Sequence, residues 1–130
     1  MKTVSIYNFL HAFISVCGGF CSYWLGGYDL LLKTVLCLTV LDFITGTGQS
    51  LYNKTFTARA CAKGTMKKVF IYLTVALSVI VGHFIGDNIP IREIVITFYI
   101  VSEGMSTLEN IGKVIDYPAK LKEIFQSLNE

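Results

Sequence analysis

Asp42 and Glu103 are the residues with the most chemical meaning, because each lies near the middle of a long apolar stretch. If those stretches cross a membrane, an ionised carboxylate at that depth costs at least about 2.5–3.5 kcal/mol. Such a group is protonated, paired with a cation or turned toward water. We expect no Lys or Arg at the matching depth, and His11 is the only mid-span candidate partner. Two interpretations stay open: a helix pair that faces a polar interior or water, or a protonated carboxyl bonded to neighbouring backbone.

Other reactive side chains are too scattered for catalysis or metal binding. The four cysteines stand at positions 17, 21, 37 and 61, far from a cluster with His11 or His83. The sequence contains no nucleophile–base constellation, Gly-rich phosphate loop or nucleotide motif. The net charge of +2 is too small to indicate nucleic acid. We therefore expect no enzymatic activity, no metal and no cofactor.

The composition is that of a membrane protein. Hydrophobic residues make up 53% of the 130 positions and charged residues only 15%, against about 25% charged residues in soluble domains. A small soluble globule needs more polar side chains than this to cover its surface. Disordered chains are poor in apolar residues, so disorder is excluded as well. The sequence predicts one all-α integral membrane domain over residues 1–130.

Apolar runs long enough to cross the bilayer place the expected helices. A spanning helix needs about 20 mostly apolar residues, which predicts spans over about 4–25, 30–50, 69–86 and 91–115. A basic loop over 52–68 and a tail over 117–130 with a short amphipathic helix complete the chain, and Asp29 is a candidate N-cap. Two alternatives stay open: a cleaved signal peptide in place of the first span, and a fourth helix that lies on the membrane surface.

Positive charge predicts the orientation. The loop over 52–68 should lie in the cytoplasm against anionic headgroups, where each Lys or Arg contributes about 1 kcal/mol. With four spans, both chain ends are then cytoplasmic. The basic residues of this loop are Lys54, Arg59, Lys63, Lys67 and Lys68.

Each predicted span carries small and polar residues at helical spacing. In lipid, such stripes allow close helix contact and hydrogen bonds between helices. The third span has the most regular stripe, which we predict to be a helix-packing face. Its members are Thr74, Ser78, Gly82 and Gly86.

The order of motifs resembles the toxin secretion/phage lysis holin family of Gram-positive bacteria and their phages. The resemblance covers about residues 30–128, and the segment over 99–110 is its most specific part. A Thr stands at position 57, where the family usually has Ser. The matching motifs are Asp42-x-x-Thr45-Gly46, Lys63-Gly64, Tyr99-Ile100-x-x-Glu103-Gly104-x-Ser106-x-x-Glu109-Asn110 and Pro118-x-x-Leu121-Lys122.

This resemblance implies a protein of the bacterial cytoplasmic membrane that assembles into homo-oligomers and opens large holes. Through these holes a cytoplasmic endolysin reaches the cell wall, or a toxin or bacteriocin leaves the cell. The holin does not need to contact the endolysin or toxin directly. Lipids and other copies of the chain are the expected partners. The candidate lumen-facing or subunit-contact residues are Asp42, Gly46, Glu103, Ser106, Glu109 and Asn110.

Two functions of other classes stay open beside this one. A small oligomeric ion or proton channel could conduct through Asp42 and Glu103. A non-conducting membrane scaffold could dock a partner through its C-terminal helix. Passage of a folded protein separates a holin from a channel, and an intact membrane potential identifies a scaffold.

Overall fold

Five helices and no strand form the part of the chain that the computed structural model describes, residues 2–86 and 88–128. Three of them are long and apolar enough to cross a membrane, over Thr3–Trp24, Leu30–Tyr52 and Ala58–Ile85. These findings confirm an all-helical membrane protein. Helix α4 is less apolar than these three helices. Met1, Asn129 and Glu130, at the ends of the predicted domain, lie outside the described residues. The helices are α1 (Lys2–Trp24), α2 (Leu30–Tyr52), α3 (Ala58–Ile85), α4 (Ile91–Gly112) and α5 (Ala119–Leu128).

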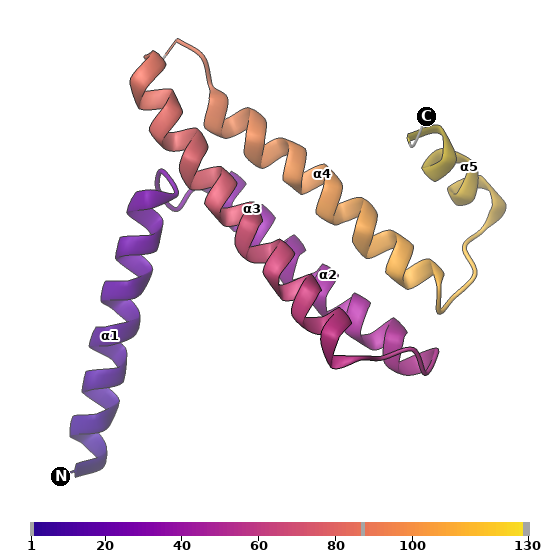
Figure 1. Ribbon diagram of the computed structural model, residues 1–130, viewed down its shortest axis with the longest axis horizontal. Helices are drawn as coiled ribbons and strands as arrows, with labels where there is room; N and C mark the ends of the chain where they lie inside the picture. Colours follow the sequence, from indigo (N-terminus) through magenta and orange to yellow (C-terminus); the bar gives the residue numbers. More distant parts are fainter. Residues whose placement is uncertain (1, 87, 129–130) are drawn as a thin grey trace.

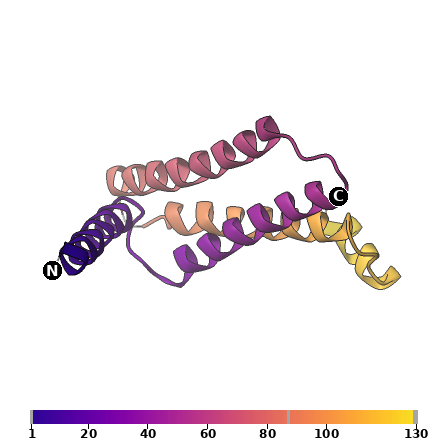
Figure 2. The ribbon, with the colours of Figure 1, turned by 90° about the horizontal axis from the view of Figure 1, so that it is seen from below.

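Helices α2, α3 and α4 form a bundle in which α4 packs along both of the others (Figures 1 and 2). Its apolar core is small and joins Leu32 and Val35 to Val75 and Ile96. The remaining buried positions are mostly polar. They are Thr39, Asp42, Ser78, Glu103 and Thr107. A bundle buried in lipid has no hydrophobic drive for association, so this polar interior is a source of cohesion and not a defect.

Helix α1 diverges from the bundle at the turn that follows it (Figure 1). Nearly all of its described side chains are exposed within the single chain, the large apolar ones included. Helix α5 lies outside the bundle and beside the C-terminal part of α4 (Figure 1), where Lys122 and Gln126 line a recess together with Leu108. Within the described chain, α1 therefore has no packing partner along most of its length.

The predicted basic loop is wrong, because most of it is helical. Helix α3 begins at Ala58, where the Thr57 hydroxyl accepts a hydrogen bond from the Ala60 N–H at 3.2 Å. Only residues 53–57 connect α2 to α3. The error has a physical cause: charged residues end the apolar span but not the helix, because Ala and Lys are good helix formers wherever the helix leaves the hydrocarbon. Three of the basic residues recur every four positions along α3 and are exposed, namely Arg59, Lys63 and Lys67.

Arg92 fastens the turn between α1 and α2 to the start of α4. Its guanidinium donates to the Leu25 and Gly27 carbonyls at 2.6 and 3.0 Å, and pairs with the Asp29 carboxylate at 2.7 Å. Asp29 also accepts the Leu32 N–H at 2.9 Å, which confirms the predicted N-cap of α2. Gly26 has a φ of +81°, and a Cβ there would lie 2.5 Å from Arg92 Nε. The turn therefore needs glycine both for its conformation and for the close approach of Arg92.

Asp29 should make this end of the bundle sensitive to acid. The hydrogen bond from Arg92 lowers the pKa of Asp29 from 3.8 to about 2. A lowered pKa adds stability that is present above pH 3.8 and is lost as the pH falls through about 2. We expect Asp29→Asn to be less stable than the wild type near neutral pH and the gap to close in acid, as measured by thermal unfolding in micelles. Asp116→Asn, at a carboxylate 98% exposed, is the control, and a gap independent of pH would contradict the prediction.

Candidate functional site: a buried ionic cluster

Three ionisable side chains from three helices meet inside the bundle. The Lys68 ammonium on α3 pairs with the Asp42 carboxylate on α2 and with the Glu103 carboxylate on α4. The Glu103 side chain is fully buried, and those of Asp42 and Lys68 are only 11% and 14% exposed. We call these three residues the ionic cluster. It joins all three helices of the bundle at one level.

The helix geometry explains why the two carboxylates share a level. Asp42 is twelve residues after the start of α2, and Glu103 is twelve residues after the start of α4. At 1.5 Å per residue, each lies about 18 Å along its helix. Arg92 holds the two starting ends together through Asp29, so the two helices run in register.

The sequence predicts no basic partner for the two carboxylates at this depth, and this prediction is wrong. Lys68 reaches both carboxylates because α3 continues well before position 69, which places Lys68 inside the bundle. His11 is exposed on α1 and does not join the cluster. The sequence contains a signal that could have identified Lys68. It lies three, seven and ten residues before buried Ile71, Val75 and Ser78, and so on the buried face of α3.

Asn110 extends the cluster by about two turns along α4. Its side-chain amide donates to Asp42 Oδ1 at 3.0 Å and approaches Thr45 Oγ1 at 3.3 Å. A Cβ on Gly46 would lie 3.3 Å from Asn110 Nδ2. Gly46 thus provides the space in which the amide reaches the Asp42 carboxylate. Five predicted site residues therefore lie together: Asp42, Gly46, Glu103, Ser106 and Asn110.

A second polar contact lies one turn nearer the apolar core. The hydroxyls of Thr39 on α2 and Tyr72 on α3 are 2.6 Å apart. On the opposite side of the cluster, the Thr107 hydroxyl of α4 donates to the Glu103 carbonyl at 2.8 Å. The sequence alone does not indicate the contact between Thr39 and Tyr72. A tyrosine in an apolar run is typical of a lipid-facing position, and its hydroxyl partner lies on another helix.

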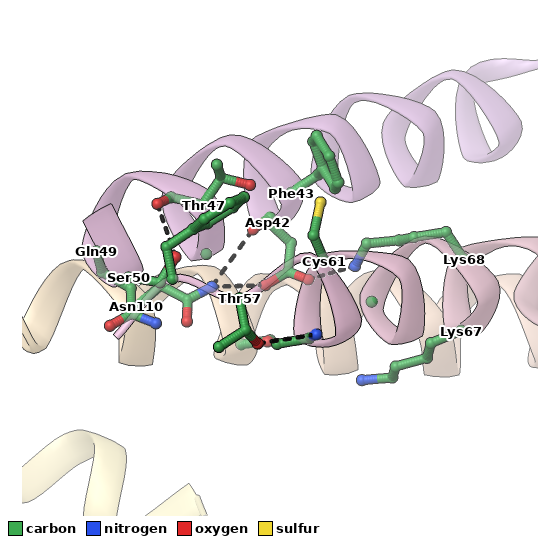
Figure 3. Close-up of a pocket in the computed structure, with 15 residues that line it drawn as sticks. Asp42, Phe43, Thr47, Gln49, Ser50, Thr57, Cys61, Lys67, Lys68 and Asn110 are labelled. Carbon is green, nitrogen blue, oxygen red and sulfur yellow. Dashed lines mark hydrogen bonds and ion pairs between the residues drawn. The ribbon is translucent and has the colours of Figure 1, made fainter. Parts of the chain in front are cut away.

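A cavity of about 260 Å³ leads from the 53–57 connector toward the cluster. Its wall includes Asp42, Lys68 and Asn110, together with hydroxyl groups such as that of Ser106. Figure 3 shows the Asp42 carboxylate between Asn110 and Lys68, and Lys67 also lines this cavity without an ion pair to Asp42. The structure therefore places a polar recess between α2 and α3 on the side of the basic residues.

The other predicted site residues lie in different places. Glu109 is exposed and lies in a separate recess beside Tyr117, so it does not join the ionic cluster. On α3, Ser78 is buried and Thr74, Gly82 and Gly86 are half-buried, with Gly86 at the C-cap. Lys54 lies in the connector, with a φ of 57°. Within the described residues, no group of three or more His, Cys, Asp or Glu side chains could hold a metal ion.

Comparison with known proteins adds independent information. A model of the bacteriophage holin family matches residues 19–130. An uncharacterised protein of Listeria monocytogenes is 32% identical over 85% of this chain and 77% of its own. An uncharacterised 14.9 kDa protein of Clostridium perfringens is 28% identical over 96% of both chains. A protein of Bacillus phage phi105 named a probable holin is 26% identical over 77% of this chain and 75% of its own.

No solved structure is significantly similar to this chain. The family match includes α2, α3 and α4 entirely, and with them all three members of the ionic cluster. It confirms the resemblance derived from the motifs, and the family is one of membrane-pore proteins, not of enzymes. The chain belongs to the bacteriophage holin family.

Proposed function

We propose that this protein is a holin, which assembles in the cytoplasmic membrane and opens holes that release a cytoplasmic endolysin, a toxin or a bacteriocin. Family membership carries the proposal. The polar bundle interior is compatible with it, because the same side chains that bond within one chain could line a wet interior between several chains. Lipids and other copies of the chain are the partners that this function requires.

The proposed topology has four spans and both termini in the cytoplasm. Helix α4 packs along α2 and α3, and its Glu103 pairs with Lys68 of α3. A bilayer that contains α2 and α3 therefore contains α4 at the same depth. With α1 as a further span, the 53–57 connector and both chain ends lie on one side, where exposed Arg59, Lys63 and Lys67 favour the cytoplasm.

Thiol labelling tests this topology. In a background without the four native cysteines, we expect Lys33→Cys to react with an impermeant reagent added outside the cell. We expect Lys120→Cys to react only after the membrane is opened, since it should lie inside. Lys54→Cys is the matched control on the predicted inner side. Labelling of Lys120→Cys from outside would contradict four spans.

Release of trapped cargo tests the function. Vesicles that contain both a small dye and a folded fluorescent protein should lose both when the purified chain reaches a critical density, because association depends on concentration. Loss of the dye alone would instead indicate a small channel, for which the polar recess beside Asp42 is the supporting observation. Retention of both would indicate a non-conducting scaffold.

A further inference from the structure

We propose that the ionic cluster is a proton-binding site, which takes up one proton from the water at the basic end of the bundle. The first observation is the balance of charge. Two carboxylates, Asp42 and Glu103, meet a single ammonium group, that of Lys68. With every group ionised, the cluster holds one uncompensated negative charge inside the bundle. One proton makes it neutral.

Among the described residues, no other cation forms an ion pair with either carboxylate. On α3, Tyr72 is neutral and bonded to Thr39. The Lys67 side chain lines the same recess (Figure 3), but it is exposed to water and forms no ion pair with Asp42 or Glu103. On α4, the nearest other carboxylate, Glu109, is exposed and outside the cluster. Burial of an uncompensated charge costs several kcal/mol per ion, so a proton is bound in preference.

The second observation is an oxygen atom without a partner. Glu103 Oε2 contacts Lys68, but Glu103 Oε1 is buried and accepts no hydrogen bond from any described residue. An ionised carboxylate needs donors at both oxygens, whereas a neutral acid loses far less when one oxygen is unpaired. The charge balance and the unpaired oxygen therefore point to the same extra proton.

The third observation is a route. Asp42 and Lys68 line the recess that leads from the connector, whereas Glu103 does not. A hydronium ion in the recess gives its proton to Asp42, forming a carboxyl O–H bond and leaving water. Lys68 Nζ can then pass one of its protons to Glu103 and regain one from Asp42, because it contacts both carboxyl groups. The bound proton belongs to the cluster as a whole.

Infrared spectroscopy of the full chain in lipid tests this site. At about pH 7 exposed carboxyl groups are ionised, so a C=O band of protonated carboxylic acid should come from the cluster alone. We expect this band in the wild type and its loss in both Asp42→Asn and Glu103→Gln. Each of these variants leaves one carboxylate and one ammonium, which are neutral without an added proton. Asp116→Asn, which removes an exposed carboxylate, should keep the band.

Two results would overturn the assignment: no such band in the wild type, or a band that persists in both amide variants. Circular dichroism shows whether each variant is folded. If neither variant folds, the infrared spectrum of the wild type alone decides whether the protonated carboxyl group is present. A metal cation in place of the proton would make thermal stability depend on exchange of Na⁺ for choline at constant pH, and would also overturn the proposal. The spectra do not involve hole formation, so their failure and that of the proposed function are distinguishable.

Discussion

Replacing Lys68 with Met should lower the free energy of unfolding of the bundle by about 3–5 kcal/mol. The change removes the only cation that contacts Asp42 and Glu103 among the described residues, and even with the proposed proton bound it leaves one buried carboxylate without a cation. Loss of one partner from a buried ionic group carries a penalty of this size because the remaining charge stays desolvated. Denaturation in mixed micelles, followed by circular dichroism, measures it.

The neighbouring residue supplies the control. Lys67→Met removes the same charge from an exposed position on α3, where substitutions change stability by about 0.5 kcal/mol or less. If Lys68→Met were as mild as Lys67→Met, the two ion pairs would contribute nothing to the bundle.

The penalty should disappear when the carboxylates are removed as well. A triple variant, Asp42→Leu with Lys68→Met and Glu103→Leu, fills the same interior with apolar side chains. Replacement of a buried ionic triad by apolar groups of similar volume is commonly neutral or stabilising by about 1–4 kcal/mol. We therefore expect the triple variant to unfold no more easily than the wild type.

Sequence patterns predicted a helix correctly where its apolar run and its capping residue indicate the same boundary. Helix α2 begins at Leu30 as predicted, because Asp29 supplies both a turn and an N-cap. Asp42, Gly46 and Asn110 come together because each motif lies on one face of its helix. What failed was the boundary of α3. A lysine at position 68 can lie in a loop or point into the bundle from a longer helix. Which of the two occurs depends on whether a carboxylate of another helix lies within reach.

The position of Lys68 also changes the interpretation of the two carboxylates. From sequence, we expect them to face a polar interior or water, or to be protonated and bonded to neighbouring backbone. In the structure Lys68 of the same chain pairs both of them, so they need no wet interior shared between several chains. The proposal of an assembled hole depends on the family and on what happens when the bundle opens. An opened bundle would present three charged groups and Asn110 to whatever replaces the lost contacts.

The apolar triple variant separates the stability of the bundle from its proposed function. If the ionic cluster lines a wet interior, the variant should remain in the membrane, fold and still release no folded protein from vesicles. Its interior would be apolar, so exposing it to water gains nothing, whereas exposing charged groups restores their hydration. We expect release at or near the background of vesicles without the holin chain. This loss of release should be much larger than any loss of folded protein.

The matched control for this experiment changes polar groups that lie outside the cluster. Asp116→Leu together with Lys122→Met removes one carboxylate and one ammonium from exposed positions after the end of α4. This variant should release protein like the wild type. Equal release by the apolar triple variant would show that the ionic cluster serves the closed bundle alone. The lining of any hole would then have to come from other surfaces, of which α1, without a packing partner along most of its length within the described chain, is the most extensive.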